Sequence, residues 1–256
     1  MKIISIVNQK GGCGKTTTTL SLGAALAERG FRVLIVDLDQ QHNATDTLYG
    51  RDYNGYSTVD MIYFATRQIH LQVEDFIRYS DREKLDYIPA VSGLSTAPSI
   101  LANDQDSGTV LARIFRHPYF TKYDYVLLDN KPSLDLLVVN ALAASNEVLV
   151  PVEPEDYSIN GLTELRETIR RVQDSLNPGL EFNGIVISRA AMVRSEAQKA
   201  EQLLRQEYGD LVYKTIIPNR ADVANAKRAG VTVLQQRGSD LGNRFRALAA
   251  EIVSRG

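Results

Sequence analysis

Short apolar runs alternate with longer stretches of helical periodicity along almost the whole chain. This alternation is typical of an α/β fold, in which a mostly parallel, twisted sheet has helices on both faces. Ligands of such sheets bind beyond the carboxyl ends of the strands. The predicted strands are Ile3–Val7, Val33–Val36, Leu85–Ile88, Val126–Leu128, Val148–Val152, Gly184–Ile187 and Val212–Ile217. The clearest predicted helices are Thr16–Arg29, Leu134–Ala144, Ile159–Leu176, Glu196–Tyr208 and Leu241–Val253.

One region departs from this regular pattern. The segment Tyr49–Asp81 is rich in tyrosine and less periodic, and we expect an insertion with short helices. Hydrophobic residues make up 44% of the chain and charged residues 23%, which is typical of a globular protein rather than a disordered one. The sequence shows no repeat, low-complexity tract or linker. We therefore predict a single domain over residues 1–256, a length that can bury one substantial core.

A glycine-rich segment, Lys10–Thr17 (KGGCGKTT), joins the first predicted strand to the first predicted helix. A turn of this kind points backbone N–H groups and the positive end of the helix dipole at bound phosphate. Lys15 would reach the outer phosphates, and the Thr16 hydroxyl would ligate Mg²⁺. Gln9 occupies the position of the first glycine in the usual P-loop pattern, so the strict pattern fails. The expected nucleotide contacts here are Gly11, Gly12, Cys13, Gly14, Lys15, Thr16 and Thr17.

A second lysine, Lys10, lies on the other side of these glycines from Lys15. Because the loop already has one lysine for the phosphates, Lys10 is most useful reaching across to a nucleotide on a facing subunit. There it would offset charge on the transferring phosphoryl group and act in catalysis together with Lys15. The alternative is a solvated loop lysine without a catalytic role.

These residues closely resemble the deviant Walker ATPases of the ParA/MinD family, and the resemblance extends over almost the whole chain. The segment Val36–Thr45 (VDLDQQHNAT) is similar to the family's Asp-x-Asp-Pro-Gln-Gly-Asn-x-Thr block. A carboxylate at a strand end can orient an attacking water or hold the water shell of a metal ion. By resemblance, Asp39 is catalytic and positions the hydrolytic water, and Asp37 supports the Mg²⁺ site. Without the P-loop upstream, two such acids would more often form a helix cap.

A third block, Tyr125–Asp129, is an apolar strand that ends in an acid, as in the Walker B pattern. Asp129 would bind Mg²⁺ through water. The chain departs from the family where Gln40 replaces proline, His42 replaces glycine and Asn130–Lys131 replaces Thr-Pro. These departures affect the expected switch motion and hydrolysis rate rather than nucleotide binding. The lysine of the last pair is either a surface residue or an added contact to phosphate or a partner.

The segment Ile217–Arg220 (IPNR) ends a predicted strand where the family usually has Ile-Pro-Arg-Asn. In that family this loop lies against the adenine base. The resemblance implies that Pro218 packs on the ring and that Asn219 or Arg220 contacts its edge. The alternative, a Pro-Asn turn that caps the next helix, is compatible with that role.

Charge is unevenly distributed along the chain. Residues 1–185 have 17 basic and 24 acidic side chains, whereas residues 186–256 have 12 basic and 7 acidic, so the net charge of −2 hides a basic C-terminal third. Clustered basic residues suit sequence-independent contact with a phosphate backbone, although a charge excess is usually a solvated face. By resemblance, partition ATPases bind nonspecific DNA as ATP-bound dimers. The DNA-binding candidates are Lys227, Arg228, Arg244 and Arg246, of which the first two are favoured.

The resemblance therefore implies a Mg²⁺-dependent ATPase, with ATP and Mg²⁺ as cofactors, that is cytoplasmic and associated with the nucleoid. ATP would bridge a homodimer on nonspecific DNA, and a ParB-like or cargo-adaptor protein would stimulate hydrolysis and release it. The cargo would be a plasmid, a chromosome origin or a protein body. Because Met1 lies directly before the first strand, we expect no added helix-turn-helix domain.

Two other functional classes stay open. A MinD-like membrane-cycling ATPase needs an amphipathic anchor with bulky apolar residues, whereas Phe245–Val253 is alanine-rich and typical of a packed helix, so no membrane contact is expected. A P-loop enzyme acting on a small metabolite would show turnover stimulated by that molecule. Cys13 is the only cysteine, which excludes an intramolecular disulfide and an iron–sulfur reductase with a bridging cluster. The run Ile3–Val7 is too short for a signal peptide.

Overall fold

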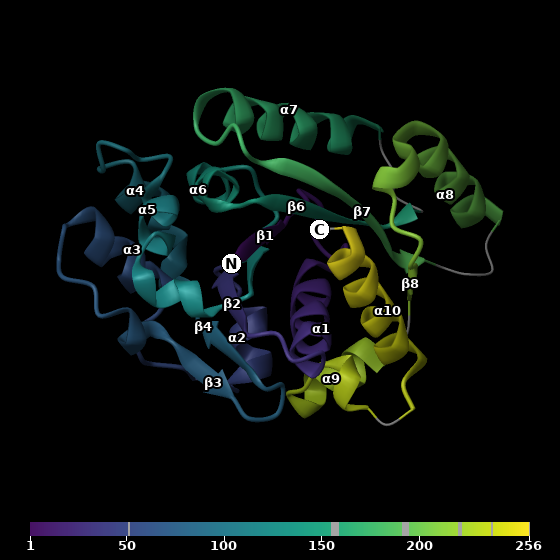
Figure 1. Cartoon of the computed structure of the whole chain (residues 1–256), viewed down its shortest axis with the longest axis horizontal. Helices are drawn as coiled ribbons and strands as arrows, with labels where there is room; N and C mark the ends of the chain where they lie inside the picture. Colours follow the sequence, from purple (N-terminus) through teal and green to yellow (C-terminus); the bar gives the residue numbers. More distant parts are fainter. Residues whose placement is uncertain (51, 155–158, 191–194, 220–221, 237, 256) are drawn as a thin grey trace.

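The computed structural model describes residues 1–50, 52–154, 159–190, 195–219, 222–236 and 238–255. Within these residues, eight strands form one sheet through the centre of the molecule (Figure 1). The strands are β1 (Lys2–Ile6), β2 (Val33–Leu38), β3 (Arg78–Ser80), β4 (Leu85–Ile88), β5 (Tyr125–Asn130), β6 (Glu147–Val152), β7 (Glu181–Ala190) and β8 (Ile217–Pro218). Their order is β3-β4-β2-β5-β1-β6-β7-β8, and neighbours are parallel except for the antiparallel pair β3 and β4.

Helices cover both faces of the sheet. Figure 1 shows α1 (Lys15–Glu28) and α10 (Asp240–Arg255) on one side, with α3 to α7 on the other. The remaining α-helices are α2 (Asn43–Leu48), α3 (Thr58–Thr66), α4 (Ala97–Leu101), α5 (Val110–Phe115), α6 (Leu136–Ala144), α7 (Ile159–Ser175), α8 (Ser195–Tyr208) and α9 (Asp222–Ala229). The predicted α/β architecture is therefore confirmed.

The two faces are built by the alternation of side chains along each strand. On β2, Val33 and Ile35 pack in the cluster that contains the apolar residues of α1 and α10. Leu34 and Val36 pack in the cluster that contains residues of α3, α4 and α5. All four side chains are buried, so the strand reads as a continuous apolar run, which is typical of a parallel sheet covered on both faces.

The carboxyl ends of β1, β2 and β5 lie together at one edge of the sheet. β5 pairs with both β1 and β2, and in this register Asp129 lies opposite Ile6 and opposite Asp37. The glycine-rich segment follows β1, the Asp37–Thr45 segment includes the end of β2, and Asp129 ends the apolar part of β5. The topology therefore brings the three predicted motifs to one place.

The predicted strand Val212–Ile217 is wrong in extent. Only Ile217–Pro218 forms a strand there, and Val212 makes an isolated bridge to Ile185. The reason lies on α10, where the Glu251 carboxylate accepts hydrogen bonds from the backbone N–H groups of Lys214 and Thr215 at 2.7 and 3.1 Å. The Glu251 side chain thus accepts the backbone N–H groups that would otherwise hydrogen-bond to a neighbouring strand.

The segment Tyr49–Asp81 contains the expected short helices, α3 and the 3₁₀ turn Val73–Phe76. It also contains β3, which the sequence analysis missed. β3 pairs with β4 in a hairpin whose tight turn includes Lys84, with a left-handed φ of 55°. A second boundary differs because Asp135 caps α6: its side chain accepts hydrogen bonds from Leu137 N and Val138 N, so the helix begins after the predicted Leu134.

Candidate functional site

The glycine-rich segment forms a turn between β1 and α1. Gly12 and Gly14 have φ values of 80° and 93°, which L side chains rarely adopt, so both positions need glycine. Ser188 on β7 donates a hydrogen bond from Oγ to the Cys13 carbonyl oxygen at 2.5 Å and fastens the turn to the sheet. The Cys13 side chain is fully buried, and burial raises the pKa of its thiol. The turn thus places the N-terminus of α1, where helix N–H groups attract anions, at the sheet edge.

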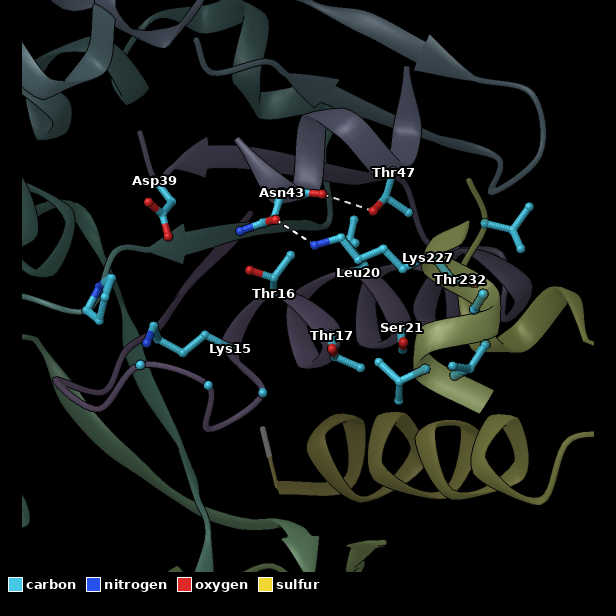
Figure 2. Close-up of a pocket in the computed structure, with 18 residues that line it drawn as sticks. Lys15, Thr16, Thr17, Leu20, Ser21, Asp39, Asn43, Thr47, Lys227 and Thr232 are labelled. Atoms are coloured by element: carbon cyan, nitrogen blue, oxygen red, sulfur yellow. Dashed lines mark hydrogen bonds between the residues drawn. The ribbon is translucent and has the colours of Figure 1, made fainter. Parts of the chain in front are cut away.

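A pocket of about 290 Å³ lies over the start of α1 (Figure 2). Glycines and polar side chains line the end nearest the turn, and α9 with the following 3₁₀ turn Val233–Gln235 lines the other. The predicted site residues that line it are Gly11, Gly12, Gly14, Lys15, Thr16, Thr17, Asp39 and Lys227. The remaining lining residues are Leu20, Ser21, Asn43, Thr47, Pro132, Val223, Ala226, Val231, Thr232 and Val233.

Lys15 provides a cation at the polar end of this pocket. Lys15 is only 7% exposed, and its Nζ donates a hydrogen bond to the Lys10 carbonyl oxygen at 2.9 Å. An ammonium group has three donors, so one hydrogen bond to a neutral carbonyl leaves capacity for an anionic ligand. Figure 2 shows Lys15 and Thr16 at the start of α1, with Asp39 on the facing segment.

Asp37 and Asp39 have different surroundings. Asp37 is buried, and its two carboxylate oxygens accept hydrogen bonds from the backbone of Asp39 and from the N–H and Oγ1 of Thr45. Burial raises its pKa to about 6. Asp39 instead lines the pocket, and its Oδ1 accepts a hydrogen bond from Gln41 N at 3.0 Å. Asp37 therefore fixes the segment that presents Asp39, and its predicted role at a Mg²⁺ site stays a prediction.

Asp129 is completely buried beside these groups. Its Oδ1 accepts a hydrogen bond from Thr19 Oγ1 at 3.2 Å, whereas its Oδ2 has no hydrogen-bond partner among the described residues. Burial, and then repulsion by Asp37, raise the pKa of Asp129 to about 8. A buried carboxylate with an unused oxygen is costly unless a cation or its water shell balances it. This donor set, next to the Thr16 hydroxyl, fits a hydrated Mg²⁺ ion.

Comparison with known proteins places this site in a family. A model of an AAA domain matches residues 1–182. The sporulation initiation inhibitor protein Soj of Bacillus subtilis is 36% identical over 100% of this chain and 99% of its own length. The chromosome partitioning protein ParA of Caulobacter vibrioides is 34% identical over 100% of this chain and 95% of its own. The chain belongs to the ParA/Soj family of partition ATPases.

A solved structure agrees with the predicted fold. The structure described as cobyrinic acid a,c-diamide synthase from Mycobacterium smegmatis, with bound ADP and magnesium, superposes with a TM-score of 0.84 at 27% identity. The match covers 99% of this chain and 94% of that protein. The fold and the ParA/MinD resemblance predicted from the sequence are thus confirmed. No helix in the described part of the chain is long and apolar enough to span a membrane.

The departures from the ParA/Soj pattern have visible local consequences. His42 stands where the pattern has glycine, and its backbone keeps a left-handed φ of 43°. Its Nδ1 lies 2.9 Å from Asp46 Oδ1, a contact that offsets part of the conformational cost. Lys131 forms an ion pair with Asp135, the cap of α6, and its side chain is only 12% exposed, so it is not a freely solvated lysine. A contact of Lys131 to phosphate or to a partner stays a prediction.

Lys10 is engaged within its own subunit. Its Nζ lies 3.8 Å from Glu153 Oε2, next to the end of β6, and the lysine side chain is 40% exposed. The ion pair is partly solvated and therefore weak. The expected reach of Lys10 toward a facing subunit stays a prediction, and it requires this ion pair to open.

The structure describes two of the three residues predicted to contact adenine, and the adenine contact stays a prediction. Pro218 is buried, Asn219 is exposed, and neither lines the pocket, while Arg220 lies outside the described residues. The apolar end of the pocket is lined by Val223, Ala226 and Val233. These pocket residues come from α9 and the 3₁₀ turn that follow the predicted loop in the chain.

The four predicted DNA-binding residues differ in their surroundings. Lys227 lines the pocket, and its Nζ donates to Asn43 Oδ1 at 2.8 Å. Arg246 makes two hydrogen bonds to the Glu28 carboxylate, at 2.7 and 2.9 Å. Arg228 is exposed at the C-terminal end of α9, and Arg244 is half-buried on α10.

Sequence reasoning missed the residues that hold α9 over the pocket. In the turn between β3 and β4, Arg82 donates to the carbonyl oxygens of Ala229 and Gly230, each at 3.3 Å. The neighbouring Glu83 is 4% exposed and accepts hydrogen bonds from Thr232 N and Oγ1, both at 2.8 Å. The only signal in the sequence was the neighbouring pair of charged residues, Arg82 and Glu83, in a segment with no recognised motif.

Proposed function

We propose that this chain is a Mg²⁺-dependent ATPase whose nucleotide state controls DNA binding and so positions a cargo. The observation that carries the proposal is that Lys15, Thr16 and Asp39 line one pocket, beside the unpartnered Oδ2 of Asp129. A lysine and a hydroxyl at a helix N-terminus, facing carboxylates, are the groups used in phosphoryl transfer to water. The relative solved with ADP and magnesium supports ATP and Mg²⁺ as the cofactors.

Each of these residues has its own part in hydrolysis. Lys15 would exchange the Lys10 carbonyl for the outer phosphate oxygens, which offer a charge-assisted hydrogen bond. Thr16 through its hydroxyl, and Asp129 through water, would hold Mg²⁺, which supplies Lewis-acid stabilisation of charge on the phosphates. Asp39, held by the Gln41 N–H, would orient the attacking water.

The apolar end of the pocket is the place for the nucleotide base. Leu20 of α1, Val223 and Ala226 of α9, and Val233 line this end. Binding sites for cofactors are typically apolar with a few polar groups that fix orientation, here Ser21 and Thr232. The contacts expected from Pro218, Asn219 and Arg220 by resemblance stay a separate prediction.

ATP would bring two subunits together and complete the site. Lys10 stands at the edge of the turn and is 40% exposed, so a second nucleotide can compete with Glu153 for its ammonium. This supports a homodimer in the ATP state, with Lys10 acting across the interface. Hydrolysis would be slow until a ParB-like or cargo-adaptor protein stimulates it, as the resemblance to partition ATPases implies.

DNA would bind to the exposed basic residues near α9. Lys227 and Arg228 are both exposed, but the Lys227 ammonium donates to Asn43, and the charge of Arg246 is offset by Glu28. Arg82 lies against the C-terminal end of α9 and donates hydrogen bonds to neutral carbonyl groups. Its positive charge therefore stays available to a DNA phosphate. We therefore assign the main contact to Arg228, with Arg244 as a peripheral one. Such contacts are independent of base sequence, and they would place the protein on nucleoid DNA in the cytoplasm.

The test is steady-state ATP hydrolysis with Mg²⁺ or with EDTA, combined with a nucleotide-binding measurement. We expect slow, Mg²⁺-dependent turnover that Lys15→Ala abolishes together with binding. Asp39→Ala should keep nucleotide binding and lose hydrolysis, and the exposed Lys214→Ala is the matched control. Hydrolysis that survives Asp39→Ala, or turnover that depends on an added small metabolite, would contradict the proposal.

A further inference from the structure

Lys227 links the two walls of the nucleotide pocket. Figure 2 shows its side chain extending from α9 over α1 to Asn43, and the donor–acceptor distance is 2.8 Å. Both residues line the same pocket as Lys15, Thr16 and Asp39. The hydrogen bond joins residues that are 184 positions apart in the chain.

At one end of this link is the segment that presents Asp39. Asn43 is the first residue of α2, and its carbonyl oxygen accepts a hydrogen bond from Thr47 Oγ1 at 2.9 Å. Between Asp39 and Asn43 the chain makes a turn closed by His42 N donating to the Asp39 carbonyl oxygen at 2.9 Å. A displacement of Asn43 is therefore passed to Asp39 through one short, hydrogen-bonded turn.

At the other end is a fixed support. Arg82 and the buried Glu83 bind the chain on the C-terminal side of α9, at Gly230 and Thr232. Gln235 adds a hydrogen bond from Nε2 to the Arg82 carbonyl oxygen at 2.8 Å. Because α9 is fastened to the β3–β4 turn in this way, Lys227 holds Asn43 against a rigid element rather than a loose one.

We propose that Lys227 is a positioning residue for ATP hydrolysis, which it serves by holding the Asp39–Asn43 segment through its hydrogen bond to Asn43. The inference rests on the proposed ATPase function. A side chain that orients the attacking water must be placed within a fraction of an ångström, and its supports affect turnover more than substrate binding. Lys227 thus acts through Asn43 and Asp39, and the bond to Asn43 also couples the nucleotide site to the helix that carries Arg228.

A double-mutant cycle tests this role. The variants are Lys227→Met, Asn43→Ala and the two combined, with the exposed α9 residue Asn225→Ala as the matched control. We expect each single change to lower kcat about tenfold while the dissociation constant for ATP changes less than about twofold, and the combination to cost no more than either alone. Lys227→Arg, which keeps a donor, should restore most of the turnover.

Two results would overturn the inference. Additive losses in the double variant would show that Lys227 and Asn43 act separately. Weaker ATP binding with unchanged kcat in Lys227→Met would show that Lys227 binds the nucleotide directly. If the wild-type protein does not hydrolyse ATP, the proposed ATPase function fails. Failure of the Lys227 inference is distinguishable from this outcome, because the cycle compares each variant with measurable wild-type turnover. Thermal unfolding of each variant identifies loss of fold, in which case Lys227→Gln provides the milder change.

Discussion

Asp37 on β2 and Asp129 on β5 lie opposite each other in the register of two parallel strands. Both are buried, and the pKa of each is raised, to about 6 for Asp37 and about 8 for Asp129, first of all by burial. The two are not equivalent, because Asp37 is satisfied by Thr45 and the Asp39 backbone whereas Asp129 keeps an unpartnered oxygen. Asp37 therefore holds the segment that carries Asp39, whereas the unpartnered oxygen of Asp129 is available to the proposed metal ion.

Replacing Asp129 by asparagine separates function from stability. Asp129→Asn should lower Mg²⁺-dependent hydrolysis by about a hundredfold, because a neutral amide cannot balance the ion. In EDTA its melting temperature should not fall, since the change removes a buried carboxylate with an unsatisfied oxygen. Hydrolysis assays and thermal unfolding in EDTA measure the two effects. The exposed Asp174→Asn is the control, and a variant that hydrolyses ATP normally would refute the assignment of Asp129.

Opening the Lys10–Glu153 ion pair should favour the dimer. Because a partly solvated pair is worth about 0–1 kcal/mol and the dimer opens one pair in each subunit, Glu153→Gln should tighten ATP-dependent self-association by no more than about thirtyfold. Lys10→Ala should abolish the ATP-dependent gain. Sedimentation with a non-hydrolysable ATP analogue gives both dissociation constants. Equal self-association of Lys10→Ala and wild type would show that Lys10 does not cross the interface.

The two arginines that differ most in their surroundings should differ in their effect on DNA. Arg228→Ala should weaken binding to duplex DNA and reduce the slope of log affinity against log salt by about 1, as loss of one phosphate contact does. Arg246→Ala should have little effect because Glu28 already neutralises that side chain. Fluorescence anisotropy over a range of salt concentrations makes the comparison. The reverse order of effects would move the DNA surface from α9 to α10.

The buried contact between Glu83 and Thr232 should contribute to stability. Glu83→Ala leaves the Thr232 N–H and hydroxyl without their acceptor and should lower the free energy of unfolding by about 1–3 kcal/mol. The exposed Glu74→Ala should change it by less than about 0.5 kcal/mol. Urea unfolding followed by circular dichroism compares them. Equal stability of the two variants would mean that α9 is held in place by other contacts.

Local sequence patterns predicted those parts of the structure that local patterns determine. The predicted strand Val33–Val36 is a continuous apolar run and is buried within β2, and Gly12 and Gly14 occupy positions whose φ values require glycine. The Lys227–Asn43 bond was missed because it joins distant positions, and a lysine beside an arginine on a helix has the same pattern whether it faces a pocket or solvent. The strand predicted at Val212–Ile217 was too long for a related reason, since Glu251 captures its N–H groups from another element.

The central claim is that nucleotide state controls DNA binding, and one measurement tests it most directly. Binding of wild type to random-sequence duplex DNA is compared without nucleotide, with ADP, and with ATP and Mg²⁺, at low and high salt. Asp39→Ala and Arg228→Ala are measured alongside. We predict salt-sensitive binding only with ATP and Mg²⁺, strengthened by Asp39→Ala, which retains ATP, and weakened by Arg228→Ala. Binding that is the same in all nucleotide states, or absent from all of them, would contradict the account.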